Sequence, residues 1–372
     1  MFDTLARVAT LTIKELLAIF KDPRGRLTLF VPPIMQCLIF GYAATYNLNR
    51  VPYAVLDQDR SAASQDLLAR LDGSGVFYRV ANLGNNADID RYIDRREALF
   101  VLAIASDFER RLQMGLPADV QVIADGRNSN TAGTSQGYLQ AIVAQFNADW
   151  RARHAMPEPP IRVESRAWFN PNLETRWNMV PAMIGTLTML QTLLVTALSV
   201  ARERENGTFD QLLVTPFRPL ELLAGKALPS LFIGFVQATT VLLVAQLWFQ
   251  IPFAGSFITL YAGLTLFLLA AIGIGLFVSS VVGTMQQALL FTFVLVLPFT
   301  LLSGLATPIS SMPRVLQYVT LANPLRYAID LTHRVYLEGA PLWNLRGDLW
   351  PLALIAFVTL SAATWMFRHR LG

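Results

Sequence analysis

Acidic and basic residues are almost absent from six stretches of this 372-residue chain. Charged residues make up 15% of the chain and hydrophobic residues 53%. Each stretch has about 20 apolar residues, the length that a helix needs to cross roughly 30 Å of hydrocarbon. The composition therefore predicts an α-helical polytopic membrane protein. The six predicted spans cover residues 27–47, 178–200, 227–249, 257–281, 286–305 and 348–367.

The spans offer very little that could carry an ion. Apart from Asp348, at the first position of the sixth span, they contain no Asp, Glu, Lys or Arg. A carrier driven by protons or sodium ions needs an ionisable relay inside the membrane, so this class of transporter is disfavoured. Amides remain, and we take Gln191, Gln237 and Gln287 as candidates for a substrate path. Hydrogen bonding between helices is the alternative for each of them.

The residues of an energy-supplying or hydrolytic site are also missing. There is no G-x-x-x-x-G-K-[ST] phosphate loop, so the chain is not expected to hydrolyse ATP itself. The three histidines, His154, His333 and His369, are far apart and have neither metal-ligand spacing nor a G-x-S-x-G partner. We expect no catalytic residue, no metal ion and no cofactor, and an energy source on another protein. A membrane-anchored enzyme is the disfavoured alternative.

A single cysteine, Cys37, lies within the first span, so no disulfide can form within the chain. The long polar segment 48–177 must therefore be stabilised by its own core. It carries 15 Arg against 16 Asp and Glu, and this balance provides no basic face for nucleic acid. Short strand patterns alternate with helix patterns from residue 51 to 154, which predicts an inserted α/β domain.

Lys and Arg gather in three of the segments outside the spans, and short cytoplasmic loops carry such an excess. Residues 1–26, 201–226 and 368–372 are therefore predicted to be cytoplasmic, which makes 48–177 and 306–347 external. The basic residues that decide this are Arg7, Lys14, Lys21, Arg24, Arg26, Arg202, Arg204, Arg218, Lys226, Arg368 and Arg370.

Two of these segments have helical patterns of their own. Residues 1–26 contain an amphipathic stretch typical of a helix in the headgroup plane. Residues 306–347 are semi-apolar but contain four prolines, which predicts short or re-entrant external helices. A cleaved signal peptide is the alternative to an anchored first span, and the length of that span together with Pro32 and Pro33 favours the anchor.

The densely charged strip "RERENGTFDQLLVTP" lies between the second and third spans. Asn206 and Gly207 suit the left-handed end of a helix, Thr208 and Gln211 have capping-box spacing, and Pro216 ends the short helix that follows. So short a helix is unstable alone in water, which indicates that it docks on a partner; a solvated loop that only enforces topology is the alternative. The predicted contact residues are Arg202, Glu203, Arg204, Glu205, Gly207, Thr208, Asp210, Gln211, Leu212, Leu213, Thr215 and Pro216.

The run "RERENGTFDQLLVTPFRPLELLAGK" resembles the cytoplasmic loop of ABC-2 type exporter permeases, in particular the bacterial group with a large external domain after the first span. "LLSGLATPISSMP" followed by "NPLRYAIDL" is similar to the segment before the last helix of that family. The resemblance covers essentially the whole chain, including "VLDQDRSAASQDLL". The chain departs from the family pattern at Asp210, where Glu is favoured, and at Thr307, where Phe is common.

This resemblance implies a permease of the bacterial inner membrane that pairs with a second permease, identical or homologous, and with two cytoplasmic ATP-binding subunits. Such systems can also include a periplasmic membrane-fusion adaptor. The strip would then couple ATP hydrolysis to transport, and the uncharged spans favour an amphipathic or hydrophobic, drug- or lipid-like substrate. The alternative is a membrane component for signalling or assembly that is coupled to an ATPase but transports nothing.

Overall fold

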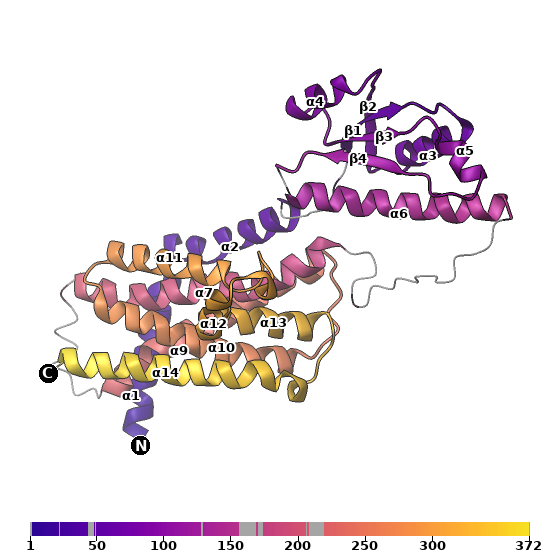
Figure 1. The fold of residues 1–372 in the computed structure, drawn as a ribbon. Coiled ribbons are helices and arrows are strands. Elements are labelled where there is room, and N and C mark those ends of the chain that lie inside the picture. Colours follow the sequence, from indigo (N-terminus) through magenta and orange to yellow (C-terminus); the bar gives the residue numbers. More distant parts are fainter. Residues whose placement is uncertain are drawn as a thin grey trace. The chain divides into compact units, whose positions relative to one another are not determined.

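The structure is a computed structural model, and it describes residues 2–21, 23–43, 48, 50–127, 129–155, 169, 174–205, 207 and 219–371. The chain forms two compact units. The helical unit comprises Met1–Ala44 and Ala167–Gly372, and the α/β unit comprises Thr45–Arg166. Figure 1 colours both along the sequence.

The helical unit is built around one long helix, α7, which packs against α2, α9, α10, α11 and α13. A π-helical turn, Val244–Trp248, continues α9, and short 3-10 turns lie at Ile309–Ser311, Thr320–Ala322 and Leu342–Leu345. The helices are α1 (Phe2–Lys21), α2 (Pro23–Ala43), α7 (Thr175–Glu205), α9 (Pro219–Leu243), α10 (Phe257–Val281), α11 (Met285–Leu301), α12 (Arg314–Val319), α13 (Pro324–Tyr336) and α14 (Arg346–Leu371).

Four helical segments of the described chain are long and apolar enough to cross a membrane. They are Thr175–Glu205, Leu220–Trp248, Phe257–Val281 and Leu342–His369. Two shorter apolar helices, Leu29–Tyr42 and Met285–Leu301, lie where the first and fifth spans were predicted. Between α11 and α14 the chain forms the short helices that its prolines predicted.

Helix α11 presents a wide apolar face outward. Leu290, Val294 and Leu297 are 66%, 67% and 63% exposed. Such a continuous apolar surface is rare on a water-soluble monomer, whereas lipid tails solvate it without cost. The outward face therefore suits a helix in a bilayer.

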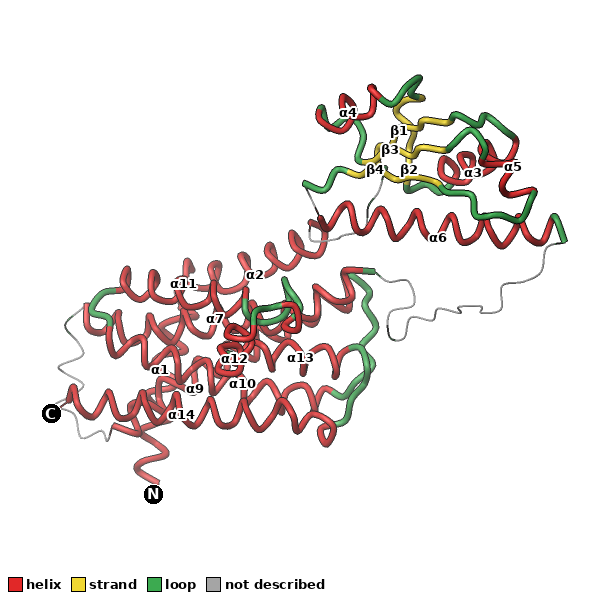
Figure 2. The backbone as a smooth tube through the Cα atoms, viewed as in Figure 1, coloured by secondary structure: helices red, strands yellow, loops and turns green. Residues whose placement is uncertain are grey.

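The α/β unit contains a four-stranded sheet in the order β2-β1-β3-β4. Strand β1 is parallel to β2 and β3, and β4 is antiparallel to β3. The order of strands and helices follows the alternation expected from the sequence (Figure 2). The elements are β1 (Val51–Asp57), α3 (Ala62–Gly73), β2 (Phe77–Asn82), α4 (Ala87–Asp94), β3 (Phe100–Ile104), α5 (Phe108–Gln113), β4 (Val120–Ala124) and α6 (Ser129–Arg153).

Each face of the sheet has its own core. On one face Tyr53 and Phe100 stack with ring centroids 5.4 Å apart, and α3 and α6 cover them. On the other face Ala54 and Val101 pack against Ile89 of α4. Because alternate residues of a strand point to opposite faces, these two cores need apolar residues at both parities of β1 and β3. The unit is thus held together by burial on both sides of its sheet and not by disulfides.

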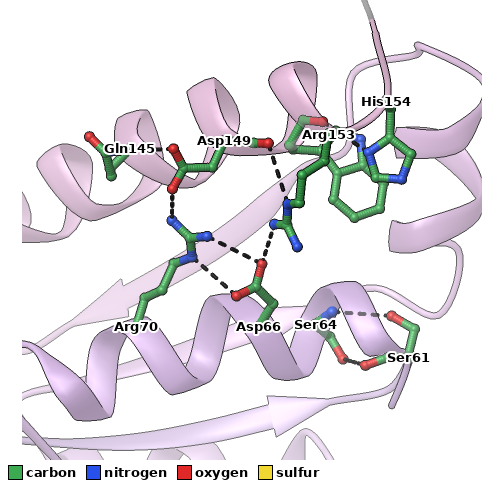
Figure 3. Close-up of polar contacts among 9 residues, drawn as sticks. Ser61, Ser64, Asp66, Arg70, Gln145, Asp149, Arg153 and His154 are labelled. Atoms are coloured by element: carbon green, nitrogen blue, oxygen red, sulfur yellow. Dashed lines mark hydrogen bonds and ion pairs between the residues drawn. The ribbon is translucent and has the colours of Figure 1, made fainter.

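Helices α3 and α6 are also clamped by a network of ion pairs (Figure 3). Arg70 Nη1 lies 2.5 Å from Asp149 Oδ2, and Arg153 Nη2 lies 2.5 Å from Asp66 Oδ2. Burial alone would raise the pKa of Asp66, but the hydrogen bonds from Arg153 and Arg70 outweigh it and the pKa lies below its usual value. The same physics, led by the hydrogen bond from Arg70, lowers the pKa of Asp149.

Candidate functional site at the ends of helices α7 and α9

Helix α7 ends where the sequence predicted. Gly207 has φ +68°, and its N–H donates to the carbonyl oxygen of Arg204 over 3.1 Å. A left-handed residue at this position is a common way to end a helix. The short helix predicted after it, with Thr208, Asp210, Gln211, Leu212, Leu213, Thr215 and Pro216, lies outside the described residues.

A buried cluster of charges joins the end of α7 to the beginning of α9 and to α1. Lys226 Nζ lies 2.6 Å from Glu203 Oε2 and 3.2 Å from Glu15 Oε1, and it donates to Ser199 Oγ over 3.1 Å. The Lys226 side chain is only 1% exposed. The ammonium group donates hydrogen bonds to Glu15 Oε1 and Ser199 Oγ, and Glu203 adds the close ion pair. We refer to Lys226, Glu203, Glu15 and Ser199 as the Lys226 cluster.

The Lys226 cluster is a costly arrangement that depends on all its members. Removing a charge from water is strongly unfavourable unless a partner replaces the lost hydration. Taking away one partner of a buried ion pair costs about 3–5 kcal/mol, because the other charge stays buried. Lys14, 60% exposed and 3.6 Å from Glu203 Oε1, adds a solvated pair that contributes much less.

Close packing brings α1 into this cluster. A Cβ on Gly225 would overlap the side chain of Leu11, which is buried. The absence of that Cβ lets α1 lie directly on α9, and Glu15, one turn along from Leu11, reaches Lys226. The residues 1–26 were predicted to form an interfacial helix, and in the structure this segment forms α1 and the first turn of α2, with α1 packed on α9.

The last turn of α7 also holds the connection between α10 and α11. Arg204 Nη1 donates to the carbonyl oxygens of Ser280 and Val282, over 3.0 and 2.9 Å, at the end of α10. The N–H of Met285, the first residue of α11, donates to Glu205 Oε2 over 2.8 Å. A cation at a helix C-terminus and an anion at a helix N-terminus are both favourable. The end of α7 is therefore linked to α1, α9, α10 and α11.

These contacts show what some of the residues predicted to contact a partner bind within their own chain. Glu203, Arg204 and Glu205 were assigned as partner contacts, and in the structure each of them binds helices of its own chain. Arg202 is exposed. Lys226 was noted only as one of the basic residues that set the topology. No local pattern predicts its role, because Glu15 precedes it by 211 residues.

A polar seam runs from the Lys226 cluster along the contact between α7 and α9. Ser199 bonds to Lys226, and a Cβ on Gly234 would touch Thr192. The two contacts show that the helices are antiparallel, and the same register places Thr188 level with Gln237. Thr188, Thr192 and Gln237 are buried, and within the described part of the chain their side-chain polar atoms have no hydrogen-bond partner. Buried polar groups without a hydrogen-bond partner are rare in proteins, and each usually has a structural or functional explanation.

The three candidate glutamines occupy different settings. Gln237 lies in the α7–α9 seam and Gln191 is half-buried on α7. Gln287 is exposed at the beginning of α11, where its Oε1 accepts the N–H of Gly283 over 2.9 Å and its own N–H donates to Thr284 Oγ1. This is a helix cap that was not predicted, although residues 284–287 have the T-x-x-Q spacing of a capping box.

A second polar region lies at the other end of the helical unit, between α13 and α14. A pocket of about 460 Å³ is lined by Asp330, Asp348, His333 and Arg326 among others. Arg334 Nη1 lies 3.0 Å from Asp348 Oδ2, so the aspartate at the start of the sixth predicted span is paired. His333 Nε2 lies 2.7 Å from the carbonyl oxygen of Asn178, and burial lowers the pKa of this histidine.

Comparison with known proteins gives a consistent result along the whole chain. A family model described as "ABC-2 family transporter protein" matches residues 26–365. The chain is 39% identical over 364 residues to the probable multidrug ABC transporter permease YbhR of Escherichia coli K12, covering 98% of this chain and 99% of that protein. It is 30% identical to the inner membrane transport permease YhhJ of the same organism, covering 99% and 98%.

A more distant similarity is found in Bacillus subtilis. The linearmycin resistance permease protein LnrN of Bacillus subtilis is 23% identical over 371 residues, which cover 94% of this chain and 96% of that protein. The helical unit, its apolar helices and these similarities agree on a multi-pass inner-membrane protein that works with separate ATPases. The chain belongs to the ABC-2 transporter family and is a permease subunit of an ABC exporter.

Proposed function

We propose that this permease exports an amphipathic or hydrophobic, drug- or lipid-like substrate. It does so as one of two permeases, identical or homologous, driven by two ATP-binding subunits. The names of YbhR and LnrN, a probable multidrug ABC transporter permease and a linearmycin resistance permease protein, support this substrate class. The nearly uncharged spans support it as well, because apolar cavities with a few polar groups suit such molecules.

The proposed topology has six spans, with both chain ends in the cytoplasm. The spans are 27–47, 178–200, 227–249, 257–281, 286–305 and 348–367. Residues 48–177 form a periplasmic domain and 306–347 form short or re-entrant helices on the same side. The distribution of Lys and Arg supports this orientation, and the four long and two short apolar helices support the number of spans.

The ATP-binding subunits are proposed to dock on residues 201–226. The observation that carries this proposal is the Lys226 cluster. The undescribed segment 208–218 is bracketed by Glu203 on α7 and Lys226 on α9, which are joined by a buried ion pair. Pressure on a segment anchored at both ends by one rigid contact moves both helices together. Leu212 and Leu213 are the proposed apolar anchor for the ATPase, and Arg202 an adjacent charge.

Movement of α7 and α9 would reach the substrate path through the seam between them. Thr188, Thr192 and Gln237 are buried there with unused hydrogen-bonding groups. In the open state these groups would face the substrate, together with Gln191. A pair of discrete packings biased by a ligand bound elsewhere is sufficient for such a switch. Gln287, with its role as a helix cap, is the weakest member of the proposed path.

The periplasmic domain is proposed to bind protein, either a membrane-fusion adaptor or the same domain of the second permease. A tight turn would suffice to connect two spans, so a domain with two hydrophobic cores has another purpose. The stretch Asp125 to Tyr138 is rich in Gly, Ser, Thr and Asn, but from Ser129 onward it belongs to helix α6, so the proposal rests on the domain as a whole and not on this stretch.

The test is transport by the reconstituted complex. Inverted vesicles containing this permease and its ATP-binding subunit should accumulate a fluorescent amphipathic dye when ATP is added, and the Lys226→Met variant should not. ATP hydrolysis without accumulation of any of a panel of dyes would support the non-transporting alternative. Accumulation that persists in the Lys226→Met variant would refute the role given to the cluster.

A further inference from the structure

The α/β unit has a surface pocket of about 440 Å³ where the first strand begins. Three arginines line it, Arg50, Arg96 and Arg127, together with the single carboxylate of Asp125. Apolar residues, among them Leu48 and Leu99, also line it. The lining therefore combines a net positive charge with apolar side chains.

One of the three arginines, Arg127, is already paired with other residues of the unit. Arg127 Nε lies 2.8 Å from Asp125 Oδ1, and Arg127 Nη2 donates to the carbonyl oxygen of Ile93 over 2.6 Å. This pairing neutralises the only carboxylate of the lining. Among the described residues, no Asp or Glu lies within ion-pair distance of Arg50 or Arg96. The guanidinium group of Arg50 lies over the ring of Tyr78, 5.7 Å from its centroid, and such a contact leaves its N–H donors available to a ligand.

The backbone holds these two arginines in an unusual conformation. Arg50 has φ +60° and Arg96 has φ +59°, the left-handed region that costs a non-glycine residue about 1–2 kcal/mol. Strained residues of this kind cluster at ligand sites, where the surrounding structure imposes the conformation. Two of the strained residues in the described chain line one pocket.

A helix end reinforces the positive potential. Thr131, in the first turn of the 25-residue helix α6, also lines the pocket. The beginning of a long helix carries about half a positive charge and favours anions. The arginines and the helix end each favour an anion, and the conformation of the backbone is a separate feature that is typical of ligand sites.

We propose that this pocket binds an anionic headgroup, a phosphate, carried on an apolar body. The guanidinium groups of Arg50 and Arg96 can each give two parallel hydrogen bonds to phosphate oxygens, while Leu48 and Leu99 contact the adjoining apolar atoms. An anionic lipid and a free phosphate compound share this chemistry. The proposal is independent of ATPase coupling, because it concerns binding by the α/β unit.

Binding to the purified full-length protein in detergent tests the proposal. The probes are dihexanoyl phosphatidylglycerol, dihexanoyl phosphatidylcholine and inorganic phosphate, titrated by calorimetry. We expect saturable binding of the anionic lipid and at least about tenfold weaker binding to the Arg50→Gln/Arg96→Gln double variant, since each charged hydrogen bond contributes appreciably. The control double variant, Arg91→Gln/Arg110→Gln, removes the same charge outside the pocket and should bind normally.

The probes distinguish an anionic lipid from a free phosphate compound as the source of the phosphate group. Tighter binding of phosphatidylglycerol than of phosphate assigns a lipid, and equal binding assigns a free phosphate compound. The charge-preserving pair Arg50→Lys/Arg96→Lys should retain most of the affinity, which guards against a folding defect. Absence of saturable binding, equal binding of phosphatidylcholine, or equal loss in the control variant would overturn the proposal.

Discussion

Lys226 and Glu203 form an ion pair of 2.6 Å across the two ends of the segment that is proposed to contact the ATPase. The Lys226 side chain is 1% exposed, and its ammonium group also pairs with Glu15 of α1. An ion pair this well buried is a weak source of net stability but a strong constraint on arrangement, because each charge requires the other. The cluster is thus suited to hold α1, α7 and α9 in one register.

Replacing Lys226 by Met should destabilise the permease by about 3–5 kcal/mol, because two carboxylates stay buried without their cation. The double variant Lys226→Met/Glu203→Gln should recover part of this loss, because it removes one of the stranded charges. Thermal unfolding of the purified protein measures both effects. The control Lys14→Met removes an exposed lysine that also pairs with Glu203, and it should cost less than about 1 kcal/mol. Equal effects at Lys14 and Lys226 would contradict the assignment.

Replacing Gly207 by Val should uncouple ATP hydrolysis from transport while the protein still inserts into the membrane. The residue has φ +68°, which a β-branched side chain strongly disfavours. Gly207→Asn is the matched control, because Asn tolerates this conformation, and it should keep its coupling. The ratio of ATP hydrolysed to dye transported measures the effect, and a normal ratio in the Val variant would refute it.

Replacing Gln237 by Leu should leave the protein as stable or more stable but change which dyes it transports. The amide is buried without hydrogen bonds, so an apolar side chain of similar size removes a desolvation cost. Gln287→Leu should lower the stability and leave the dye profile unchanged, since it removes the hydrogen bond from the Gly283 N–H, worth about 1 kcal/mol. Unfolding midpoints and relative rates for dyes with few or many hydrogen-bond acceptors distinguish them. An unchanged dye profile for Gln237→Leu would remove this residue from the proposed path.

The α/β unit should lose stability as the pH falls below about 4. The pKa values of Asp66 and Asp149 in the folded unit lie below the ordinary aspartate value of 3.8, so their contribution to stability is complete well above that pH. It is lost as the pH falls through the folded values, because the unfolded chain then binds protons more readily. Urea midpoints of a fragment covering residues 48–177 at pH 7, 4 and 3 test this, and Asp66→Asn should flatten the dependence. A midpoint that rises on acidification would contradict the clamp.

Reporters inserted at Gly126 should show that this position lies in the periplasm. Alkaline phosphatase requires that compartment, and green fluorescent protein exported unfolded does not fluoresce there, so the two fusions should give opposite signals. Gly126 lies in the surface connection before α6, where no Cβ would meet another atom, so an insertion is expected to be tolerated. Fluorescence with no phosphatase activity would invert the whole topology.

Local patterns in the sequence were enough for the features that depend on neighbours along the chain. Apolar runs predicted the long helices, alternation predicted the strands of the α/β unit, and Asn206-Gly207 predicted the end of α7. Each of these is decided by a few residues through helix capping, strand period or burial. The cap at Gln287 belongs to the same class, and its T-x-x-Q spacing was open to the same interpretation.

Contacts between distant residues could be decided only by the tertiary structure. Lys226 finds Glu15 and Glu203 because a glycine at 225 lets α1 approach α9, and nothing near Lys226 in the sequence marks it as buried. The charges of Arg204 and Glu205, predicted to face a partner, bind helix ends of α10 and α11 in their own chain that lie more than 70 residues away. Arg50, Arg96 and Arg127 likewise meet only when the sheet forms. A charge binds the opposite charge or open helix end that packing brings within reach, and packing is a property of the whole chain.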